Sequence, residues 1–333
     1  MSTATPESTR HLRVIAVVGP TAVGKSALAE YLASSLGGQI VSADSMQVYR
    51  GMDIGTAKPA AGSRRVPYHC LDIVDPGTPY SAALYQHKAR EAIASIASAG
   101  ALPFVCGGTG LYVRAALDDW EFPGGEASNP ARQALEREAA EVGPAAMHAR
   151  LALVDPDSAR LIHPSNVRRT IRALEMAAQG DSYAAQAARF SVRHSLYDAV
   201  FLGLTMEREQ LYRLIDTRVE QMIDAGLLDE VRSLLAAGFR DGLTAAQAIG
   251  YKELVPVIET GAGLEAAVEE IKQATRRYAK RQLTWFRGDL RIRWIDATDR
   301  STEECALVAS GLLESDGPGT GTPAPGTWRL SAD

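Results

Sequence analysis

Long apolar runs and paired cysteines are both missing from this sequence, and each absence excludes a class of protein. No apolar run approaches the roughly 18 residues that a membrane-spanning helix needs, and the first residues, MSTATPESTRHLR, lack the hydrophobic segment of a secretory signal. The three cysteines, Cys70, Cys106 and Cys305, form no Cys-x-x-Cys pair and no Cys/His cluster with zinc-ligand spacing. We therefore expect a cytoplasmic protein without a disulfide framework, a structural zinc or a membrane partner.

An excess of positive charge is also missing, because the formal net charge is −5. Spread evenly, this charge would disfavour binding to nucleic acid. The basic residues are clustered, however: between positions 272 and 293 the only acid is Asp289, whereas the basic residues there are Lys272, Arg276, Arg277, Lys280, Arg281, Arg287, Arg291 and Arg293. Because salt confines the field of a charge to about 8–10 Å, such a local face can bind a polyanion on an acidic protein.

Short apolar strands alternate with helices in the first third of the chain. Strands are predicted at residues 14–18, 39–43 and 102–106, and helices at 25–36 and 82–98. This alternation is typical of an α/β fold with a parallel sheet, in which sites lie at the carboxyl ends of the strands.

A helical pattern without strands follows between about Asn129 and Ala178. Later segments are predicted as a strand at 199–204, helices at 207–225, 228–237 and 264–286, and a strand at 292–296. We therefore predict a core formed by residues 12–117 and 199–312, with a helical insertion at 118–198. The ends of the chain, residues 1–11 and 315–333, are rich in Pro, Gly, Ser and Thr and are predicted to be disordered.

The stretch GPTAVGKS, from Gly19 to Ser26, matches the phosphate-binding pattern GxxxxGK[ST] between a predicted strand and a predicted helix. Its glycines let backbone N–H groups turn toward a phosphate, and the helix N-terminus adds a positive partial charge. Lys25 supplies a mobile cation, and Ser26 supplies a hydroxyl ligand for Mg²⁺, the cofactor that we expect. The alternative is a glycine-rich turn that only caps a helix, and the two flanking elements argue against it.

Asp44 directly follows the second predicted strand, so its carboxylate should lie near the phosphate loop. In a kinase or NTPase such an aspartate holds Mg²⁺ or its water. In a transferase it can act as a general base, and as a structural residue it can cap a turn. Ser45 and Gln47 suit hydrogen bonds to the edge of a nucleobase, which favours the general base.

Six stretches of the chain resemble, in the same order, the bacterial tRNA dimethylallyltransferases, also called the tRNA isopentenyltransferase family. They are GPTAVGKS (19–26), SADSMQVYRGMDIGTAKP (42–59), CGGTGLY (106–112), HPSNVRRTIRALE (163–175), AIGYKE (248–253) and TRRYAKRQLTWFR (275–287). The resemblance runs from about Val14 to Arg293 and implies a P-loop NTPase-like parallel sheet with a helical insertion domain. It also implies transfer of a dimethylallyl group from dimethylallyl diphosphate to N6 of adenosine 37 in tRNAs that read codons beginning with U.

The same resemblance implies roles for individual residues. Asp44 would accept the N6 proton, while Thr109 and Arg218 would contact the departing diphosphate from two sides, which makes these three the catalytic candidates. Thr109 can also be a helix N-cap, and both roles can hold at once, whereas the alternative for Arg218 is an exposed helix arginine. The implied diphosphate-binding residues are Gly19, Thr21, Ala22, Val23, Gly24, Lys25 and Ser26, of which Ser26 would share Mg²⁺.

The implied RNA partner is the anticodon stem-loop of tRNA, from which the target adenine would be flipped out. The implied tRNA-binding residues are Asp44, Ser45, Met46, Gln47, Thr109, Arg132, Arg168, Arg169, Thr170, Ile171 and Arg172. The three aromatics of the basic segment, Tyr278, Trp285 and Phe286, are predicted as core residues on their spacing alone. Two stretches depart from the family pattern: residues 176–198 lack its Thr-Gly-x-Pro-x-Ser sequence, and Cys70 replaces a residue of a His-rich pair.

Three other functions compete with this interpretation. A P-loop kinase or ATPase would use Asp44 on Mg²⁺, and an adenylate isopentenyltransferase would prenylate free AMP, ADP or ATP without a large helical insertion. An RNA-binding module with a vestigial loop would not need intact Lys25, Ser26 and Asp44. The resemblance favours a monomer without a stable protein partner.

Overall fold

The computed structural model describes residues 12–122, 130–242 and 244–315. Its contacts divide the chain into a larger unit, Met1–Asp118 with Ser195–Asp333, and a smaller unit, Asp119–His194. The termini predicted to be disordered lie outside the described residues, except for Ser315. None of the helices in these three ranges is both long and apolar enough to span a membrane.

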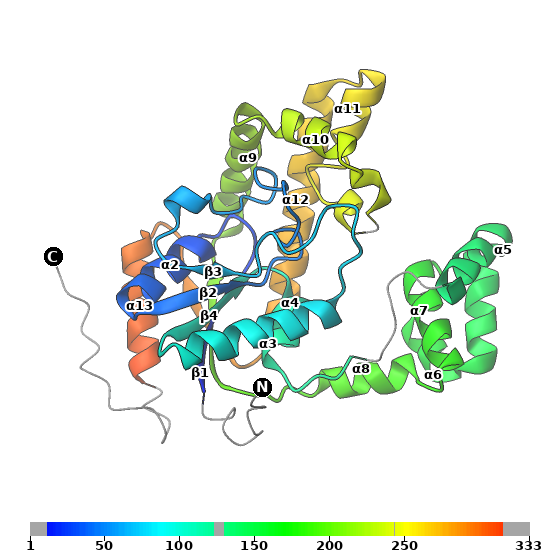
Figure 1. The fold of residues 1–333 in the computed structure, drawn as a ribbon, viewed down its shortest axis with the longest axis horizontal. Coiled ribbons are helices and arrows are strands. Elements are labelled where there is room, and N and C mark those ends of the chain that lie inside the picture. Colours follow the sequence, from blue (N-terminus) through cyan, green and yellow to red (C-terminus); the bar gives the residue numbers. More distant parts are fainter. Residues whose placement is uncertain (1–11, 123–129, 243, 316–333) are drawn as a thin grey trace. The chain divides into compact units, whose positions relative to one another are not determined.

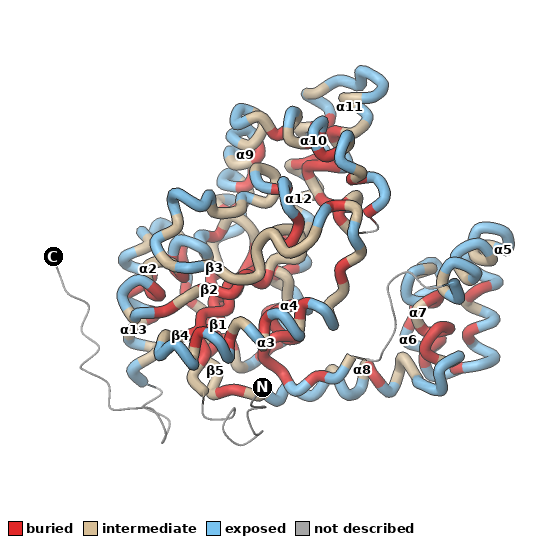
Figure 2. The backbone as a smooth tube through the Cα atoms, viewed as in Figure 1, coloured by how far each residue is buried: buried red, intermediate tan, exposed pale blue. Residues whose placement is uncertain are grey.

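A six-stranded parallel sheet with the order β3-β2-β4-β1-β5-β6 forms the centre of the larger unit (Figure 1). Its strands are β1 (Arg13–Val18), β2 (Gly38–Ser42), β3 (Tyr68–His69), β4 (Leu102–Gly107), β5 (Asp198–Thr205) and β6 (Ile292–Asp296). The central strands are buried (Figure 2), and β1 is fully buried from Val14 to Val18 because helices cover both faces. The predicted α/β fold with a parallel sheet is confirmed.

Helices lie on both faces of this sheet because successive crossovers run in opposite directions. The connection from β1 to β2 contains α2 (Lys25–Ser35), and the connection from β2 to β4 contains α3 (Ala82–Ser98). Right-handed crossovers therefore place α2 and α3 on opposite faces. α13 (Thr302–Glu314) packs beside α2, and α4 (Gly110–Leu117) packs beside α3.

Apart from short 3-10 turns, three elements of the larger unit were not predicted from the sequence: β3, α11 (Val255–Thr260) and α13. The strand β3 has only two residues, which is too short for a recognisable pattern. The helix α13 begins at a capping box in which the Ser301 hydroxyl accepts a hydrogen bond from the Glu304 N–H and the Glu304 carboxylate accepts one from the Ser301 N–H. This local signal was present in the sequence STEE.

A group of helices follows β5 in the larger unit. They are α9 (Arg208–Asp224), α10 (Leu227–Ala236), α11 (Val255–Thr260) and α12 (Leu264–Arg287). α12 contacts both α9 and α4. Because α4 starts at the carboxyl end of β4, α12 reaches the edge of the sheet at which β1, β2 and β4 end.

The smaller unit is entirely helical in its described part. Its helices are α5 (Pro130–Val154), α6 (Pro156–Leu161), α7 (Val167–Ala178) and α8 (Tyr183–Ser191), and α5 bends where Gly143 has φ 81° before Pro144. The unit ends at His194 rather than at the predicted residue 198. The reason is that the following residues join the sheet unit, where the Leu196 N–H donates to the Leu117 carbonyl at 2.8 Å.

Candidate active site

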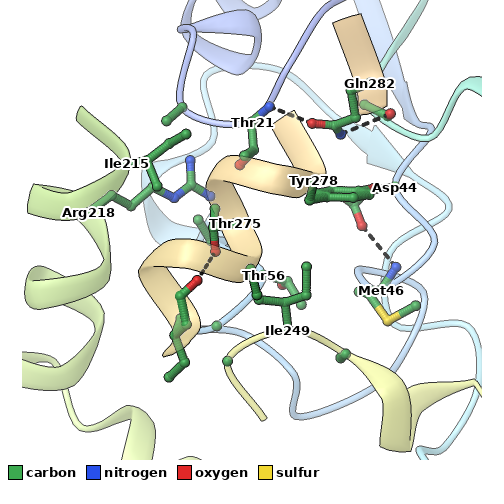
Figure 3. A pocket seen from close by; sticks show the side chains of 18 of the residues that line it. Thr21, Asp44, Met46, Thr56, Ile215, Arg218, Ile249, Thr275, Tyr278 and Gln282 are labelled. Carbon is green, nitrogen blue, oxygen red and sulfur yellow. Dashed lines mark hydrogen bonds between the residues drawn. The ribbon is translucent and has the colours of Figure 1, made fainter. Parts of the chain in front are cut away.

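A cavity of about 580 Å³ lies at the carboxyl ends of β1, β2 and β4 (Figure 3). Thr21, Asp44 and Gly108 line it from the loops after these strands. α9 and α12 supply the facing walls, and the loop of residues 247–252 closes another side. The predicted convergence of the phosphate loop and Asp44 at one edge of the sheet is therefore present, in a cavity large enough for a small ligand.

The phosphate loop adopts the backbone that its glycines permit. Gly19 has φ 145° and Gly24 has φ 95°, and a Cβ on Gly19 would lie 2.6 Å from the Leu204 carbonyl oxygen. Ala22 has φ 65°, a left-handed conformation that is unfavourable for a residue with a side chain. Of the seven residues predicted to bind diphosphate, Thr21, Ala22, Lys25 and Ser26 line the cavity, while Gly19, Val23 and Gly24 shape the loop around it.

Lys25 is the cation at the base of the cavity. Its Nζ donates to the Pro20 carbonyl at 2.5 Å. The pKa of Lys25 is lowered from 10.5 to about 8, mainly by burial and in part by the charge of Arg218, whereas Cys106 and Asp44 oppose this shift. An anion that entered the cavity would stabilise the charged ammonium, so the site favours a ligand that brings negative charge.

Asp44 has both a structural and a chemical position. Its Oδ1 accepts a hydrogen bond from the Met46 N–H at 2.8 Å, which forms the turn foreseen as the structural alternative (Figure 3). Its side chain also lines the cavity, and its negative charge raises the pKa of Lys25 and of Arg218. The carboxylate is thus close enough to two cations to interact with both.

Arg218 extends from α9 into the cavity (Figure 3). Burial lowers its pKa, and the charge of Asp44 partly offsets this effect. Among the described residues, its guanidinium forms no ion pair within 4 Å. A half-buried cation of this kind is arranged to receive an anionic ligand, which makes the exposed-surface alternative for Arg218 wrong.

Thr109 is the N-cap residue of α4, as the helix-cap interpretation predicts, but its side chain makes no capping hydrogen bond. Instead, its Oγ1 accepts from the Ser45 N–H at 3.1 Å and lies 3.3 Å from the Ser45 hydroxyl. Thr109 is absent from the cavity lining, whereas Ser45, Met46 and Gln47 belong to it. In this structure Thr109 therefore fixes the segment that follows Asp44, and its contact with diphosphate stays a prediction.

Gln47 is held at the cavity by its neighbours. Its Oε1 accepts from the Ser42 hydroxyl at 2.8 Å, and its Nε2 donates to the Thr56 carbonyl at 3.2 Å. Thr56 also lines the cavity (Figure 3). This arrangement keeps a polar edge beside Asp44, where a nucleobase could be bound by hydrogen bonds.

Several cavity residues were missed in the sequence analysis. On α12, Gln282 lines the cavity, is buried and forms hydrogen bonds to two loops. Tyr278, which was predicted as a core residue, also lines the cavity, and burial is the main reason that its pKa is raised to about 12. The cavity-lining residues from the loop before α11 are Gln247, Ala248, Ile249, Gly250, Tyr251 and Lys252. Five of these lie in the stretch AIGYKE, whose resemblance to the family was the available signal.

The basic segment is only partly available to a polyanion. Three of its cations are occupied by acids: Lys272 by Glu220 and Glu269, Arg276 by Asp216, and Arg291 by Asp118 and Asp289. The exposed basic residues are Arg277, Lys280, Arg281 and Arg287, of which Arg277 and Arg281 line the cavity. The prediction of core aromatics is confirmed for the buried Phe286 and wrong for Trp285, which is 46% exposed.

In the helical unit, the predicted RNA-binding segment Arg168 to Arg172 has two faces. Arg168 and Arg169 are exposed, whereas Thr170 and Ile171 are buried in the core of the unit. Arg172 and Arg132 lie 3.6 and 3.5 Å from the buried Glu175 carboxylate. The exposed arginines are therefore the ones that can meet RNA directly, and Arg172 and Arg132 neutralise Glu175.

The oxygen atoms at the cavity fit a magnesium ion. Mg²⁺ prefers a few protein oxygens together with water and substrate phosphates. The Ser26 hydroxyl and the Asp44 carboxylate both line the cavity. No group of three or more His, Cys, Asp or Glu side chains in the described ranges could hold a metal ion. A metal here would therefore share its ligands with a bound diphosphate.

Family models match the chain over most of its length. The IPP transferase model matches residues 47–289, and the isopentenyl transferase model matches residues 12–66. The chain belongs to the IPP transferase family. The isopentenyl transferase match covers the phosphate loop and Asp44, and the IPP transferase match covers the cavity residues from Gln47 onward. Together the two matches include all the residues that line the cavity.

Similar proteins of the IPP transferase family are named tRNA dimethylallyltransferase. The protein from Geobacillus kaustophilus is 46% identical over 308 residues, which cover 91% of this chain and 98% of that protein. The protein from Bacillus subtilis is 47% identical over 287 residues, with 86% and 91% covered.

Solved structures agree with this assignment. A tRNA isopentenylpyrophosphate transferase from Bacillus halodurans is 43% identical with a TM-score of 0.66, and the match covers 91% of this chain and 97% of that one. A eukaryotic dimethylallyltransferase acting on tRNA is 28% identical with a TM-score of 0.75, over 91% and 80% of the two chains. The predicted family, P-loop NTPase-like fold and enzyme class are confirmed.

Proposed function

We propose that this protein transfers a dimethylallyl group from dimethylallyl diphosphate to N6 of adenosine 37 in tRNAs that read codons beginning with U. The observation that carries the proposal is a single cavity in which a phosphate loop, the cation Arg218 and the carboxylate of Asp44 meet. The family relatives named for this reaction support the choice of substrates.

The reaction needs charge stabilisation at one end of the cavity and proton removal at the other. The adenine N6 attacks C1 of the allylic donor, the N6–C1 bond forms, and the C1–oxygen bond breaks. The diphosphate leaves with the bonding electrons toward the phosphate loop, where Lys25 and Arg218 stabilise its charge. Asp44 accepts the proton that N6 loses.

The acceptor adenine is bound on the side of the cavity formed by Ser45, Met46 and Gln47. The fixed amide of Gln47 offers a donor and an acceptor to the edge of the base. Arg277 and Arg281 lie where the cavity meets the exposed basic face of α12, and they neutralise phosphates of the entering strand. Ser26 would hold Mg²⁺, which supplies further positive charge to the diphosphate when it is bound.

One reaction mixture tests this proposal against its nearest rivals. The protein is incubated with Mg²⁺, dimethylallyl diphosphate, unmodified tRNA and an equal amount of AMP, and the nucleosides are analysed by mass spectrometry. We expect one five-carbon unit on adenosine from the tRNA alone. Label on AMP would instead identify the protein as an adenylate isopentenyltransferase. The absence of label on both would favour the kinase hypothesis, which would then be tested with ATP.

The low pKa of Lys25 predicts a pH effect on use of the donor. Lys25 is charged below pH 8 and neutral above it, because its pKa is lowered to about 8. The value of kcat/KM for dimethylallyl diphosphate should therefore fall as pH rises through about 8, since this quantity reports the free enzyme. In Lys25→Arg, whose guanidinium stays charged, the fall should vanish even if activity is lower. The same decline in both proteins would assign the titration to another group.

The exposed arginines of α7 predict a salt-dependent contribution to RNA binding. Changing both Arg168 and Arg169 to Gln should weaken tRNA binding and reduce the slope of log affinity against log salt by about 1.4–1.8, the value for two lost phosphate contacts. Arg160→Gln is the matched control, because Arg160 is an exposed arginine of the same unit that is already paired with Asp157. An unchanged salt slope in the double variant would show that this face does not touch RNA.

A further inference from the structure

Gln282 is a buried amide that connects two loops of the cavity to a third element. It lies on α12 and is 6% exposed. Its Oε1 accepts from the Thr21 N–H at 2.8 Å, and its Nε2 donates to the Gly108 carbonyl at 2.9 Å (Figure 3). Thr21 belongs to the phosphate loop after β1, and Gly108 to the turn after β4, so one side chain sets the spacing between them.

The sequence leaves room for this amide at Gly108. A Cβ at that position would lie 2.2 Å from Gln282 Nε2, closer than any two such atoms can approach. Gly108 does not have a positive φ, so its backbone conformation is open to other residues. The missing side chain at position 108 is therefore explained by the space that Gln282 occupies.

The hydrogen bond to Thr21 lies next to the most strained residue of the phosphate loop. Ala22 follows Thr21 and has φ 65°, a conformation that persists only where the surroundings fix it. On the other side of Thr21, the Pro20 carbonyl accepts from Lys25 Nζ. Gln282 thus fixes the backbone at the point where the loop would otherwise relax.

The neighbours of Gln282 on α12 contact the same turn. The hydroxyl of Tyr278, four residues earlier, interacts with the side chains of both Thr109 and Gln282. Trp285, three residues later, lies so close to Gly110 that a Cβ there would be 2.1 Å from the indole. Because residues spaced by three or four share a helix face, one face of α12 follows the turn from Gly108 to Gly110.

We propose that Gln282 is a positioning residue for the diphosphate of the donor. It holds the phosphate loop in the form that binds diphosphate and fixes its distance from the Gly108 turn. The Thr21 N–H donates to Gln282 and therefore does not donate to the ligand. Gln282 thus affects diphosphate binding through the shape of the phosphate loop. The inference deepens the proposed function and rests on it for the identity of the donor.

The test measures the binding of inorganic diphosphate in the presence of Mg²⁺ by titration calorimetry. Gln282→Met keeps the length of the side chain and removes its hydrogen-bonding groups. The control is Gln273→Met, the same change at an exposed position of the same helix. We expect diphosphate to bind about tenfold more weakly to Gln282→Met while tRNA affinity stays equal to that of the control; the melting temperature should fall, because two buried backbone groups lose their partner.

A second pair of variants keeps the test independent of any one substitution. Gly108→Ala retains Gln282 but displaces its amide, so it should also weaken diphosphate binding. In Gln282→Ala, which leaves room for the added methyl group, Gly108→Ala should have no further effect. Additive losses would mean that the two residues act separately and would overturn the proposal.

Two other outcomes would overturn the proposal. Equal diphosphate affinity in Gln282→Met and Gln273→Met would remove Gln282 from the donor site. Equal losses of diphosphate affinity and tRNA affinity would make it a packing residue of α12. Binding of diphosphate does not require transfer of the dimethylallyl group. A failure to prenylate RNA would therefore contradict the proposed function, and the diphosphate titration would still test the role of Gln282.

Discussion

Asp44→Asn is expected to lower the turnover number for RNA prenylation by about 10²–10⁴-fold, the usual contribution of a general base. Asparagine retains an oxygen that can accept from the Met46 N–H, so the turn after β2 should be preserved. It cannot accept the N6 proton, and it removes the negative charge that faces Lys25 and Arg218. The loss should therefore appear in kcat, with tRNA binding within about twofold of wild type.

The measurement is a single-turnover assay with saturating enzyme, which separates the chemical step from product release. Asp53→Asn is the matched control, because Asp53 lies on the same segment, is exposed, and pairs with Lys58 rather than lining the cavity. Normal turnover with weakened tRNA binding in Asp44→Asn would contradict the assignment of Asp44 as the base and leave it as a recognition residue.

Arg218→Gln is expected to lower kcat/KM for the donor by about 10²–10³-fold, which is the typical loss for a removed charge-stabilising group at a leaving or developing anion. Arg218 enters the cavity from α9, close enough to Lys25 for the two charges to interact, and glutamine can neither reach as far nor carry charge. Both the ground-state diphosphate and the departing one lose a cation, so KM should rise and kcat should fall.

Arg213→Gln provides the comparison, since Arg213 is an exposed arginine on the same helix outside the cavity lining. Steady-state kinetics with varied donor at saturating tRNA measure both constants. If Arg218→Gln changed tRNA affinity and left the donor constants intact, Arg218 would belong to the RNA site.

The sheet could be predicted because its signals are local. The strand residues Val14 to Val18 form a continuous apolar run, and the loop GPTAVGKS requires a strand before it and a helix after it. The two-residue β3 carries too few residues for such a pattern, because it exists only through pairing with β2. α13 does carry a local signal, the capping box that begins at Ser301.

The candidate site was predictable where residues follow a strand and not where tertiary packing decides. Lys25 and Asp44 follow β1 and β2, which end at the same edge of one parallel sheet on either side of β4, so their convergence follows from topology. Gln282 lies 261 residues from Thr21, and no periodicity of α12 indicates which loop its amide will meet. The stretch Arg168 to Arg172 was predicted as a whole to bind RNA, because a sequence motif does not distinguish the exposed face of α7 from its buried face. Thr170 and Ile171 lie on the buried face.

The most direct test of the account follows diphosphate and prenylated RNA in the same reaction. With [1-¹⁴C]dimethylallyl diphosphate, Mg²⁺ and a tRNA anticodon stem-loop, the account predicts that one diphosphate is released for each dimethylallyl group that appears on RNA, and that no diphosphate is released without RNA. Release of diphosphate in the absence of RNA, or its release with RNA but without label on adenosine, would contradict attack by the adenine amine as the step that expels diphosphate.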